Sequence, residues 1–531
     1  MNPRAIDSKT VIPHRPQRLL RDGMIAAAQR HPEKTAVIVE GKPYTYSELF
    51  HSAMSLAHAL QQRGVEKGDR VAIYMDNTWP CVVSIYGTLL AGGVFLVINP
   101  QTKADKLQFV LDDSDAKLLL TDVHLANVFL QAVDGNGKLK GIISSGDLTR
   151  LPADLSAPVK IEAFNDIVEN TQPLARPTDV IPNDLAALIY TSGSTGSPKG
   201  VMQTHQSMVF AAWSLIEYQR LSESDRIMLV LPIAFDYGLY QLLMTMKLGA
   251  TLIIERSFTF PAQIYKRIEE FEATVFPAVP TIFAMMISTH KKKKLCFPTI
   301  TRITNTAAAL PADFIPHLKE IFPNALIYKM YGLTECKRVS YLEPELVDDY
   351  PTSVGKAIPG TEIYLLSPEG APVREGETGI LYVRGPHVML GYWKQPELSE
   401  KMLKPGKLPG ERVLCTQDWF RVDDEGFLYF VGRSDDIIKT RGEKVSPIEV
   451  ENALHGIPGI KEVAVIGIND EVFGQAIKAF VVAEEQADLN DKKIKKYCLS
   501  HLENFMVPRD IVFVDSLPKT ANGKIDKKQL A

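Results

Sequence analysis

The sequence predicts an α/β protein with a large N-terminal domain of several subdomains and a small, mobile C-terminal α/β lid domain. Helical and strand-like apolar segments alternate along most of the 531 residues, which is typical of α/β layers with buried sheets. The length exceeds that of one ordinary domain. After about residue 434 the pattern changes to a compact alternation of short helices and strands. We therefore expect the two domains to span residues 1–434 and 435–531.

The first elements illustrate the alternation. Residues 36–39 and 44–46 flank the sequence EGKP and predict a β-hairpin. A helix is expected from Ser47, because apolar residues follow at helical spacing, and it should end at Gly64. Residues 264–271 predict a helix with one apolar face, and residues 273–279 predict the strand that follows it. In the small C-terminal unit, Ser446 and Pro447 predict the start of a helix.

The uncharged run at residues 81–98 is long enough to raise the question of a membrane span. Gly92 and Gly93 divide it into a helix-like part and a part rich in β-branched residues. A buried helix, a glycine stop and a core strand therefore explain the run better than a membrane span does. The N-terminal residues show no signal-peptide pattern.

Charge and cysteine content exclude several classes of partner. The 59 basic and 63 acidic residues give a formal net charge of −4, so no strong field attracts nucleic acid or an anionic membrane. The lysine run at 291–294 is isolated, and we expect a solvated loop there. The five scattered cysteines predict reduced thiols in a cytoplasmic protein.

The most informative stretch is YTSGSTGSPKG, residues 190–200, which follows the apolar strand 185–190. Its glycines, hydroxyl groups and single lysine suit the binding of a polyphosphate. It is not a Walker loop, because a proline stands where the last glycine should be and a glycine follows the lysine. The next residues, VMQTH, are expected to be extended rather than helical.

This loop resembles the phosphate loop of the adenylate-forming superfamily, which includes acyl-CoA synthetases, luciferases and nonribosomal peptide adenylation domains. Four further stretches resemble that family in the same order: MYGLTE (330–335), TQDWFRVDDEGFLYFVGRSDD (416–436), KTRGEKVSPIEVE (439–451) and PKTANGKIDKKQL (518–530). The resemblance covers essentially the whole chain. It implies a reaction in which a carboxylate attacks the α-phosphate of ATP and a thiol then displaces AMP from the acyl-AMP.

The resemblance also implies roles for individual residues. Thr334 should contact the α-phosphate, Glu335 should bind Mg²⁺, and Tyr331 should stack on adenine. The remaining residues assigned to ATP are Thr191, Ser192, Gly193, Ser194, Thr195, Gly196, Lys199, Thr306, Ala307, Asp418, Arg433 and Lys524.

Several of these assignments lie near the end of the large domain or in the lid. Asp418 stands where the family has its ribose-binding aspartate, although Gln417 replaces the glycine that usually precedes it. Arg433 matches a second ribose or phosphate contact, and Asp435 matches the hinge of the small domain. Lys524 matches the catalytic lysine that bridges the substrate carboxylate and the α-phosphate. A swing of the small domain would remove Lys524 and bring KTRGEKV towards the thiol.

The acid is indicated by the segment around Asp236. Amino-acid adenylation domains have an aspartate at this position that pairs with the substrate ammonium, and a buried ammonium needs such a counter-charge. Asp236 would also be a suitable N-cap for a helix over 237–247, which leaves this point open. The pocket implied by the resemblance consists of Asp236, Tyr237, Tyr240, Pro277, Ile303, Asn305, Met330, Arg338 and Val339.

The run MYGLTECKRVSYL resembles free-standing prolyl-carrier-protein ligases. This favours activation of an amino acid, with L-proline the first expectation, and its transfer to the phosphopantetheine of a separate carrier protein. The alternative is an AMP-forming acyl- or aryl-CoA synthetase that acts on an acid without an amine. A luciferase-like oxygenase and a non-catalytic binding protein are further alternatives that the sequence does not favour.

Overall fold

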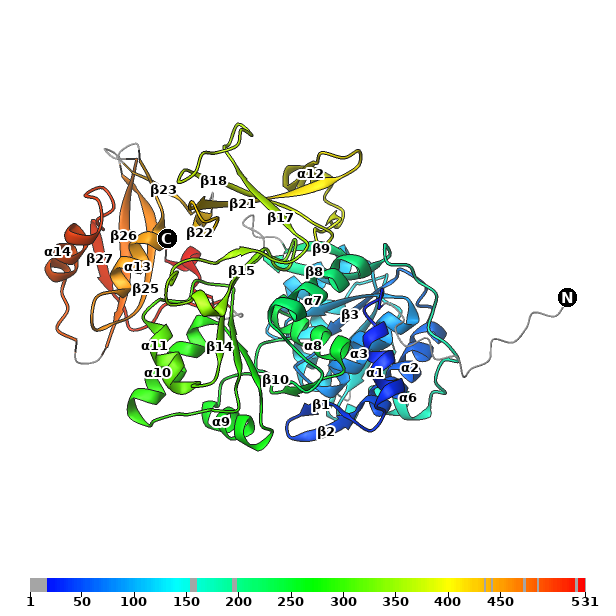
Figure 1. The fold of residues 1–531 in the computed structure, drawn as a ribbon. Coiled ribbons are helices and arrows are strands. Elements are labelled where there is room, and N and C mark those ends of the chain that lie inside the picture. The colour runs from blue at the N-terminus through cyan, green and yellow to red at the C-terminus, as the bar shows by residue number, and fades with distance from the viewer. Residues whose placement is uncertain are drawn as a thin grey trace.

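The computed structural model describes residues 17–152, 160–192, 198–433, 436–440, 443–470, 474–484, 487–520 and 524–530. Figure 1 shows a large body built on two sheets with helices, a third sheet above it, and a small C-terminal unit at its side. The arrangement is a mixed α/β fold with a large N-terminal domain and a small C-terminal domain, as the sequence predicts.

Sheet A has nine strands and forms one half of the large body. Their spatial order is β16 (Lys356–Ala357), β15 (Ser340–Leu342), β14 (Leu326–Tyr331), β13 (Arg302–Asn305), β12 (Val275–Ala278), β10 (Arg226–Leu229), β11 (Thr251–Ile254), β1 (Thr35–Val39) and β2 (Lys42–Thr45). Neighbouring strands from β14 to β1 are parallel, whereas β15, β16 and β2 pair in the antiparallel sense. Parallel strands place their carboxyl ends at one edge, where ligands bind in open α/β sheets.

Sheet B has eight strands and forms the other half. Their order is β19 (Gly391–Tyr392), β9 (Pro198–Thr204), β8 (Leu185–Ser192), β4 (Val94–Ile98), β3 (Arg70–Tyr74), β5 (Ala116–Asp122), β6 (Gly141–Ser145) and β7 (Ile161–Ala163). The hairpin β8–β9 carries the phosphate loop, and β19 from much later in the chain pairs with β9.

The helices of the large domain are α1 (Asp22–Arg30), α2 (Tyr46–Gln62), α3 (Trp79–Ala91), α4 (Ala104–Asp113), α5 (Ala126–Val133), α6 (Phe164–Asn170), α7 (His205–Tyr218), α8 (Asp236–Leu248), α9 (Pro261–Glu270), α10 (Pro280–Lys292) and α11 (Phe314–Ile321), with 3₁₀ turns at Val123–Leu125, Leu148–Arg150 and Pro344–Leu346. Side chains of α2, α3, α7 and α8 share one continuous apolar core with both sheets. These helices therefore hold sheets A and B in a fixed relation (Figure 1).

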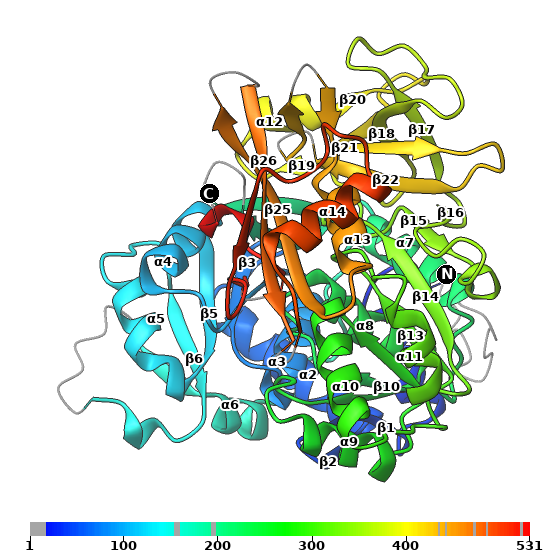
Figure 2. The same ribbon diagram turned by 90° about the vertical axis from the view of Figure 1, so that its left-hand side faces the viewer.

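Two smaller sheets complete the fold. Sheet C contains β17 (Glu362–Leu366), β18 (Thr378–Arg384), β21 (Arg412–Val422), β20 (Leu403–Pro405) and β22 (Leu428–Arg433), next to α12 (Pro396–Met402). Sheet D contains β24 (Glu443–Val445), β23 (Ile438–Thr440), β26 (Gly474–Ala483), β25 (Ile460–Asp470) and β27 (Asp510–Phe513). Helices α13 (Pro447–His455) and α14 (Asp491–His501) and a 3₁₀ turn at Lys527–Gln529 belong to the sheet D unit, which has its own core. Figure 2 shows this unit in front of the large body, below sheet C.

The local predictions are largely confirmed. The first hairpin is β1–β2, and Ser446 caps α13 by accepting from the backbone N–H of Glu449. The run 81–98 divides as predicted into α3 and β4, separated by Gly92 in the left-handed conformation (φ +83°). Within the described ranges, no helix is both long and apolar enough to cross a membrane. All five cysteines are free.

Two local predictions need correction. Helix α2 begins at Tyr46 rather than Ser47, because Thr45 forms a capping box with Glu48. The lysines at 291–294 are not simply a solvated loop, since Lys291 and Lys292 form the last turn of α10. Lys291 pairs with Glu484 of the C-terminal unit at 3.1 Å, and Lys294 pairs with Glu320 at 3.5 Å.

Gly238 fixes the first turn of α8 against the chain before it. A Cβ atom at this position would lie 2.2 Å from the carbonyl oxygen of Pro232. We expect Gly238→Ala to lower the stability by about 2–3 kcal/mol, because neither backbone segment can move freely. Thermal unfolding would measure the effect.

The matched control is Gly87→Ala in α3, where the added methyl group would meet the side chain of Leu56 from 2.8 Å. A flexible side chain can yield, and alanine gains about 1 kcal/mol of helix propensity over glycine. The control should therefore lower the melting temperature much less, and equal losses in the two variants would contradict this account.

Candidate active site

The phosphate loop begins and ends on the hairpin β8–β9. Thr191 on β8 pairs with Lys199 on β9, and Ser192 pairs with Pro198. Residues VMQTH continue β9 as an extended strand up to Thr204, and α7 begins only at His205. The chain on both sides of the loop therefore has the strand geometry that the sequence predicts. Gly193, Ser194, Thr195 and Gly196 lie outside the described residues.

Glu335 is held close to this hairpin by Tyr392. The Tyr392 hydroxyl donates to the Glu335 carboxylate at 2.6 Å, and Lys199 Nζ lies 5.5 Å from the centre of the Tyr392 ring. Gln203 on β9 donates to the carbonyl of Thr334 at 3.1 Å. The sequence analysis missed Tyr392 and Gln203, which do not belong to the motifs and are revealed only by the pairing of β19 with β9.

The Glu335 carboxylate suits a magnesium ion. Within the described part of the chain it forms no ion pair with a lysine, arginine or histidine, and Tyr392 uses only one of its lone pairs. Mg²⁺ prefers such oxygen ligands together with substrate phosphates. The donor set therefore fits the metal that the sequence implies.

Tyr331 and Asp418, which the sequence analysis assigned to adenosine, belong to one buried cluster with aromatic neighbours. The Tyr331 hydroxyl donates to the Asp418 carboxylate. The Tyr331 ring packs against Phe420 and Phe430 at 4.7 and 5.8 Å between centroids. Asp418 is 4% exposed, and Arg433 on the neighbouring strand places Nε 3.6 Å from its carboxylate. The structure thus brings Tyr331, Asp418 and Arg433 together, although stacking of Tyr331 on adenine stays a prediction.

The backbone before Asp418 explains why a glycine is usual there. Gln417 adopts a left-handed conformation with φ +60°, which glycine reaches at little cost and other residues reach less readily. Ala307 and Lys337 also have positive φ, at +77° and +63°. Strained backbone of this kind concentrates at functional sites, and here three such positions accompany residues assigned to ATP and acid binding.

Lys524 of the C-terminal unit reaches into this site. Its ammonium lies 5.7 Å from the centre of the Phe235 ring, next to Asp236. Burial and the nearby charge of Arg433 lower the pKa of Lys524. The carboxylates of Asp236, Asp418 and Glu335 act in the opposite direction. Lys524 therefore lies near Phe235 and near residues to which the sequence analysis assigned the acid and ATP, Asp236, Asp418, Glu335 and Arg433. Figure 2 shows the C-terminal unit in front of the large body.

Contacts between the two domains stabilise this position. The Lys291–Glu484 pair joins α10 to the end of β26, and the Ser446 hydroxyl donates to the carbonyl of Val431 on β22. The predicted hinge residue Asp435 lies outside the described residues, so its role stays a prediction.

Asp236 has a lysine as its neighbour. It is the first residue of α8, and Phe235 occupies the cap position, so the prediction of Asp236 as N-cap is wrong. Lys337 Nζ lies 4.0 Å from the Asp236 carboxylate and donates to its backbone carbonyl at 3.0 Å. The ammonium also lies 4.6 Å from the centre of the Tyr240 ring. Burial lowers the pKa of Lys337 to about 7, with Asp236 acting in the opposite direction.

The predicted pocket residues gather at the carboxyl ends of β12, β13 and β14. The Tyr237 hydroxyl contacts Thr304 Oγ1 at 2.5 Å, and Arg338 donates to Thr306 Oγ1. The sulfur of Met330 accepts from Tyr218, which the sequence analysis did not include. The other predicted members of the pocket are also buried: Tyr237, Tyr240, Pro277, Ile303, Asn305, Arg338 and Val339.

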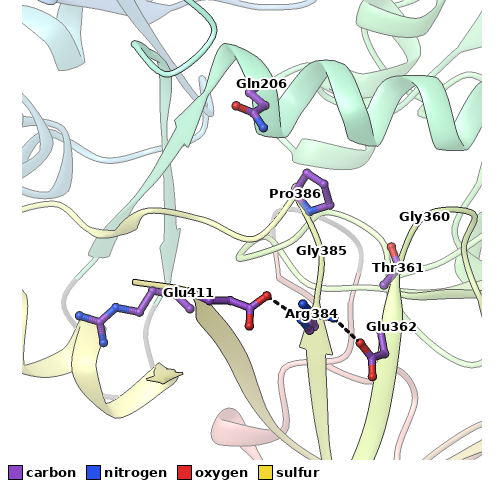
Figure 3. A pocket seen from close by; sticks show the side chains of 9 residues that line it. Gln206, Gly360, Thr361, Glu362, Arg384, Gly385, Pro386 and Glu411 are labelled. Atoms are coloured by element: carbon purple, nitrogen blue, oxygen red, sulfur yellow. Dashed lines mark hydrogen bonds and ion pairs between the residues drawn. The ribbon is translucent and has the colours of Figure 1, made fainter. Parts of the chain in front are cut away.

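A separate hollow of about 610 Å³ lies between α7 and the β17–β18 hairpin. Figure 3 shows Arg384 in this hollow between Glu362 and Glu411, which it binds at 2.7 and 2.6 Å. No residue assigned to ATP or the acid lines it. The hollow is therefore distinct from the candidate active site.

Comparison with known proteins identifies the family of the chain. The model of the AMP-binding enzyme family matches residues 25–393, and the model of the AMP-binding enzyme C-terminal domain matches residues 449–524. The chain therefore belongs to the AMP-binding enzyme family and is an AMP-forming, adenylate-forming enzyme.

Individual relatives include both CoA ligases and a tyrocidine synthase. A long-chain-fatty-acid–CoA ligase of Bacillus subtilis (strain 168) is 31% identical, over 98% of this chain and 96% of the relative. Tyrocidine synthase 3 of Brevibacillus parabrevis is 29% identical over 95% of this chain, which corresponds to only 7% of that protein. The structure of a benzoate CoA ligase from Burkholderia xenovorans LB400 superposes with a TM-score of 0.86 at 28% identity, covering 96% of this chain and 99% of that one.

Asp418 is expected to make stability depend on pH. Burial raises the pKa of Asp418 to about 6, from an ordinary value of 3.8. Because the folded state favours the protonated form, this contribution to stability is complete below pH 3.8 and is lost as the pH rises to about 6.

Asp418→Asn should therefore become more stable than the wild type as the pH rises through this window, by roughly 3 kcal/mol at neutral pH. Melting temperatures of both proteins between pH 4 and 7.5 would measure the difference. A difference that stays constant across this range would contradict the assignment. The same variant should bind ATP more weakly, because an amide accepts less strongly from ribose hydroxyls.

Proposed function

We propose that the protein is an AMP-forming acid–CoA ligase that acts on a carboxylic acid without an amine. The observation that carries this proposal is the position of Lys337 beside Asp236. An amino-acid ligase needs this aspartate for the substrate ammonium, whereas here a buried ammonium of the chain itself already lies 4.0 Å from the carboxylate. A second ammonium in the same place would bring two buried cations together. The full-length CoA ligase relatives support the same proposal.

The first half-reaction uses the residues around Lys524. A carboxylate oxygen of the acid attacks the α-phosphorus of ATP, the bond to the bridging oxygen breaks, and pyrophosphate leaves. Lys524 would hold the acid carboxylate and the α-phosphate oxygens together, so that like charges can approach. Thr334 would donate to the α-phosphate, and Lys199 would neutralise the outer phosphates with the loop. Asp418 would accept from the ribose hydroxyls.

Glu335 would hold Mg²⁺, which would supply charge neutralisation for the phosphate groups. Tyr392 keeps the Glu335 carboxylate in position through its hydroxyl. Removal of the Tyr392 hydroxyl would therefore lower the affinity for Mg²⁺, because the Glu335 carboxylate would no longer be held in position.

The second half-reaction transfers the acyl group. The thiol sulfur of coenzyme A attacks the acyl carbon, its proton is lost to solvent, and the bond to AMP breaks. Because Lys524 occupies the site in the observed lid position, we propose that the C-terminal unit turns about Asp435 before this step. The hairpin β23–β24, which carries KTRGEKV, would then face the thiol.

The second candidate is the amino acid–carrier protein ligase that the sequence favours, with L-proline as substrate. Asp236 supports it, because its side chain does not cap α8 and is 11% exposed. Burial lowers the pKa of Lys337 to about 7, so that a neutral lysine would leave the carboxylate available to an amine. A carrier-bound phosphopantetheine would then replace coenzyme A.

A panel of acids would separate the two candidates. We expect coenzyme A-dependent release of AMP with short fatty or aryl acids, and no release above background with proline or other amino acids. Pyrophosphate exchange, measured in parallel without coenzyme A, should show the same acid preference. Exchange confined to amino acids would overturn the proposal in favour of the carrier-protein ligase.

Asp236→Asn provides a test on the same panel. If the acid has no amine, its kcat/KM should change by less than about tenfold, since Lys337 can lose its proton when its counter-charge is removed. If an amine is bound, the loss should exceed about a hundredfold, because a buried ammonium is left unpaired.

Lys524→Ala should separate the two half-reactions. We expect formation of the acyl-adenylate to fall by about 10²–10³-fold, because the bridging cation is lost. Conversion of chemically supplied acyl-AMP with coenzyme A should change little, since Lys524 leaves the site before that step.

Lys519→Ala is the matched control, because Lys519 lies five positions earlier and pairs with Glu462 at 2.8 Å, outside the site. It should retain both half-reactions. Equal loss of both half-reactions in Lys524→Ala would contradict the proposed role.

A further inference from the structure

We propose that the acid carries a second anionic group at the end remote from the reacting carboxylate, and that Arg338 binds this group. The inference rests on the proposed acid–CoA ligase function and narrows its substrate class to compact dicarboxylates and similar dianions. Arg338 is then the residue that determines which acids are accepted.

Arg338 is a buried cation without a carboxylate partner. Arg338 is only 1% exposed. One guanidinium nitrogen donates to Thr306 Oγ1, while Nε has no hydrogen-bond partner among the described residues. Those residues also provide no aspartate or glutamate within ion-pair distance of it. Burial of an unpaired charge is costly, and the planar guanidinium matches a carboxylate through two parallel hydrogen bonds.

The other buried charges near Arg338 do not compensate for it. Asp236 is the acidic residue of the predicted pocket, and Lys337 Nζ lies 4.0 Å from its carboxylate. When Lys337 is protonated it offsets Asp236, and the guanidinium then leaves the pocket with one excess positive charge. An anionic group on the ligand restores the balance.

Contacts of the Phe235 and Tyr237 rings link this cation to Lys524. Lys524 lies over the Phe235 ring at 5.7 Å, the Phe235 and Tyr237 rings meet edge to face at 6.3 Å, and Arg338 lies 5.7 Å from the Tyr237 ring centre. An acid whose carboxylate faces Lys524 therefore extends along Phe235 and Tyr237 towards Arg338. The short path favours a compact molecule.

The groups around Arg338 are polar, and they would not favour the alkyl end of a fatty acid. Tyr218, whose hydroxyl donates to the sulfur of the pocket residue Met330 at 2.8 Å, adds a polar group to the same region. Asn305, directly before Thr306, is 2% exposed, and its side-chain nitrogen has no partner among the described residues. Buried donors of this kind favour an acceptor group on the ligand.

The test compares acids of equal length that differ only in the second anionic group. Propionate and malonate, butyrate and succinate, and 3-methylbenzoate and isophthalate form three such pairs. Pyrophosphate release with the wild-type enzyme should give a kcat/KM at least about tenfold higher for the diacid in one or more pairs. In Arg338→Met the kcat/KM for the diacid should fall by about 10²-fold, mostly through a higher KM. The kcat/KM for its monoacid partner should stay unchanged or rise. Arg338→Lys should recover part of the diacid activity.

Arg21→Met controls for the loss of a buried arginine far from the pocket. Arg21 is 5% exposed and donates to the carbonyls of Leu89 and Thr178. This variant should lower the melting temperature without changing the ratio of diacid to monoacid activity.

The outcomes distinguish this inference from the proposed function. If monoacids are activated with coenzyme A and diacids are not, the inference is overturned and the proposed function stands. If the KM for ATP rises equally with every acid in Arg338→Met, Arg338 serves the nucleotide and the inference is also overturned. If only amino acids are activated, the proposed function itself fails.

Discussion

The buried Lys337 ammonium is tolerated because the Asp236 carboxylate, itself only 11% exposed, lies 4.0 Å away. This pair joins the first turn of α8 to the chain between β14 and β15. The two joined segments are about 100 residues apart in sequence. The two segments carry most of the acid pocket, and the second also carries Thr334 and Glu335. The pair therefore links the predicted acid pocket to the residues assigned to ATP.

The fold brings three chemically different regions to one place. Sheet B supplies the hairpin for the phosphate loop, sheet A supplies the acid pocket at its carboxyl edge, and sheet C supplies Asp418 and Arg433. Lys524 arrives from the fourth sheet and stands among carboxylates from these regions. Such convergence allows a weak carboxylate nucleophile and a polyphosphate to meet with their charges compensated.

Much of this organisation could be predicted from the sequence, because local signals determine it. Gly92 separates α3 from β4, Ser446 caps α13, and the order of motifs indicates the family and both domains. The partners of individual charges could not be predicted. Lys337 has no periodic or motif signal that links it to Asp236, and Tyr392 reaches Glu335 only because β19 pairs with a strand almost 200 residues earlier. Contacts of this kind depend on tertiary packing, whereas the amine expected beside Asp236 rested on the resemblance to amino-acid adenylation domains.

The strand β19 has an architectural consequence. It completes sheet B after the chain has already built sheet A, and the match to the AMP-binding enzyme family ends at residue 393, directly after it. The edge of sheet B is therefore completed by the segment at which the family match ends, and strands β20, β21 and β22 of sheet C follow it in the chain. In a chimaera with a relative, a junction just before Gly391 would take Glu335 and its hydrogen-bond partner Tyr392 from different proteins, whereas a junction after residue 393 would keep the two together.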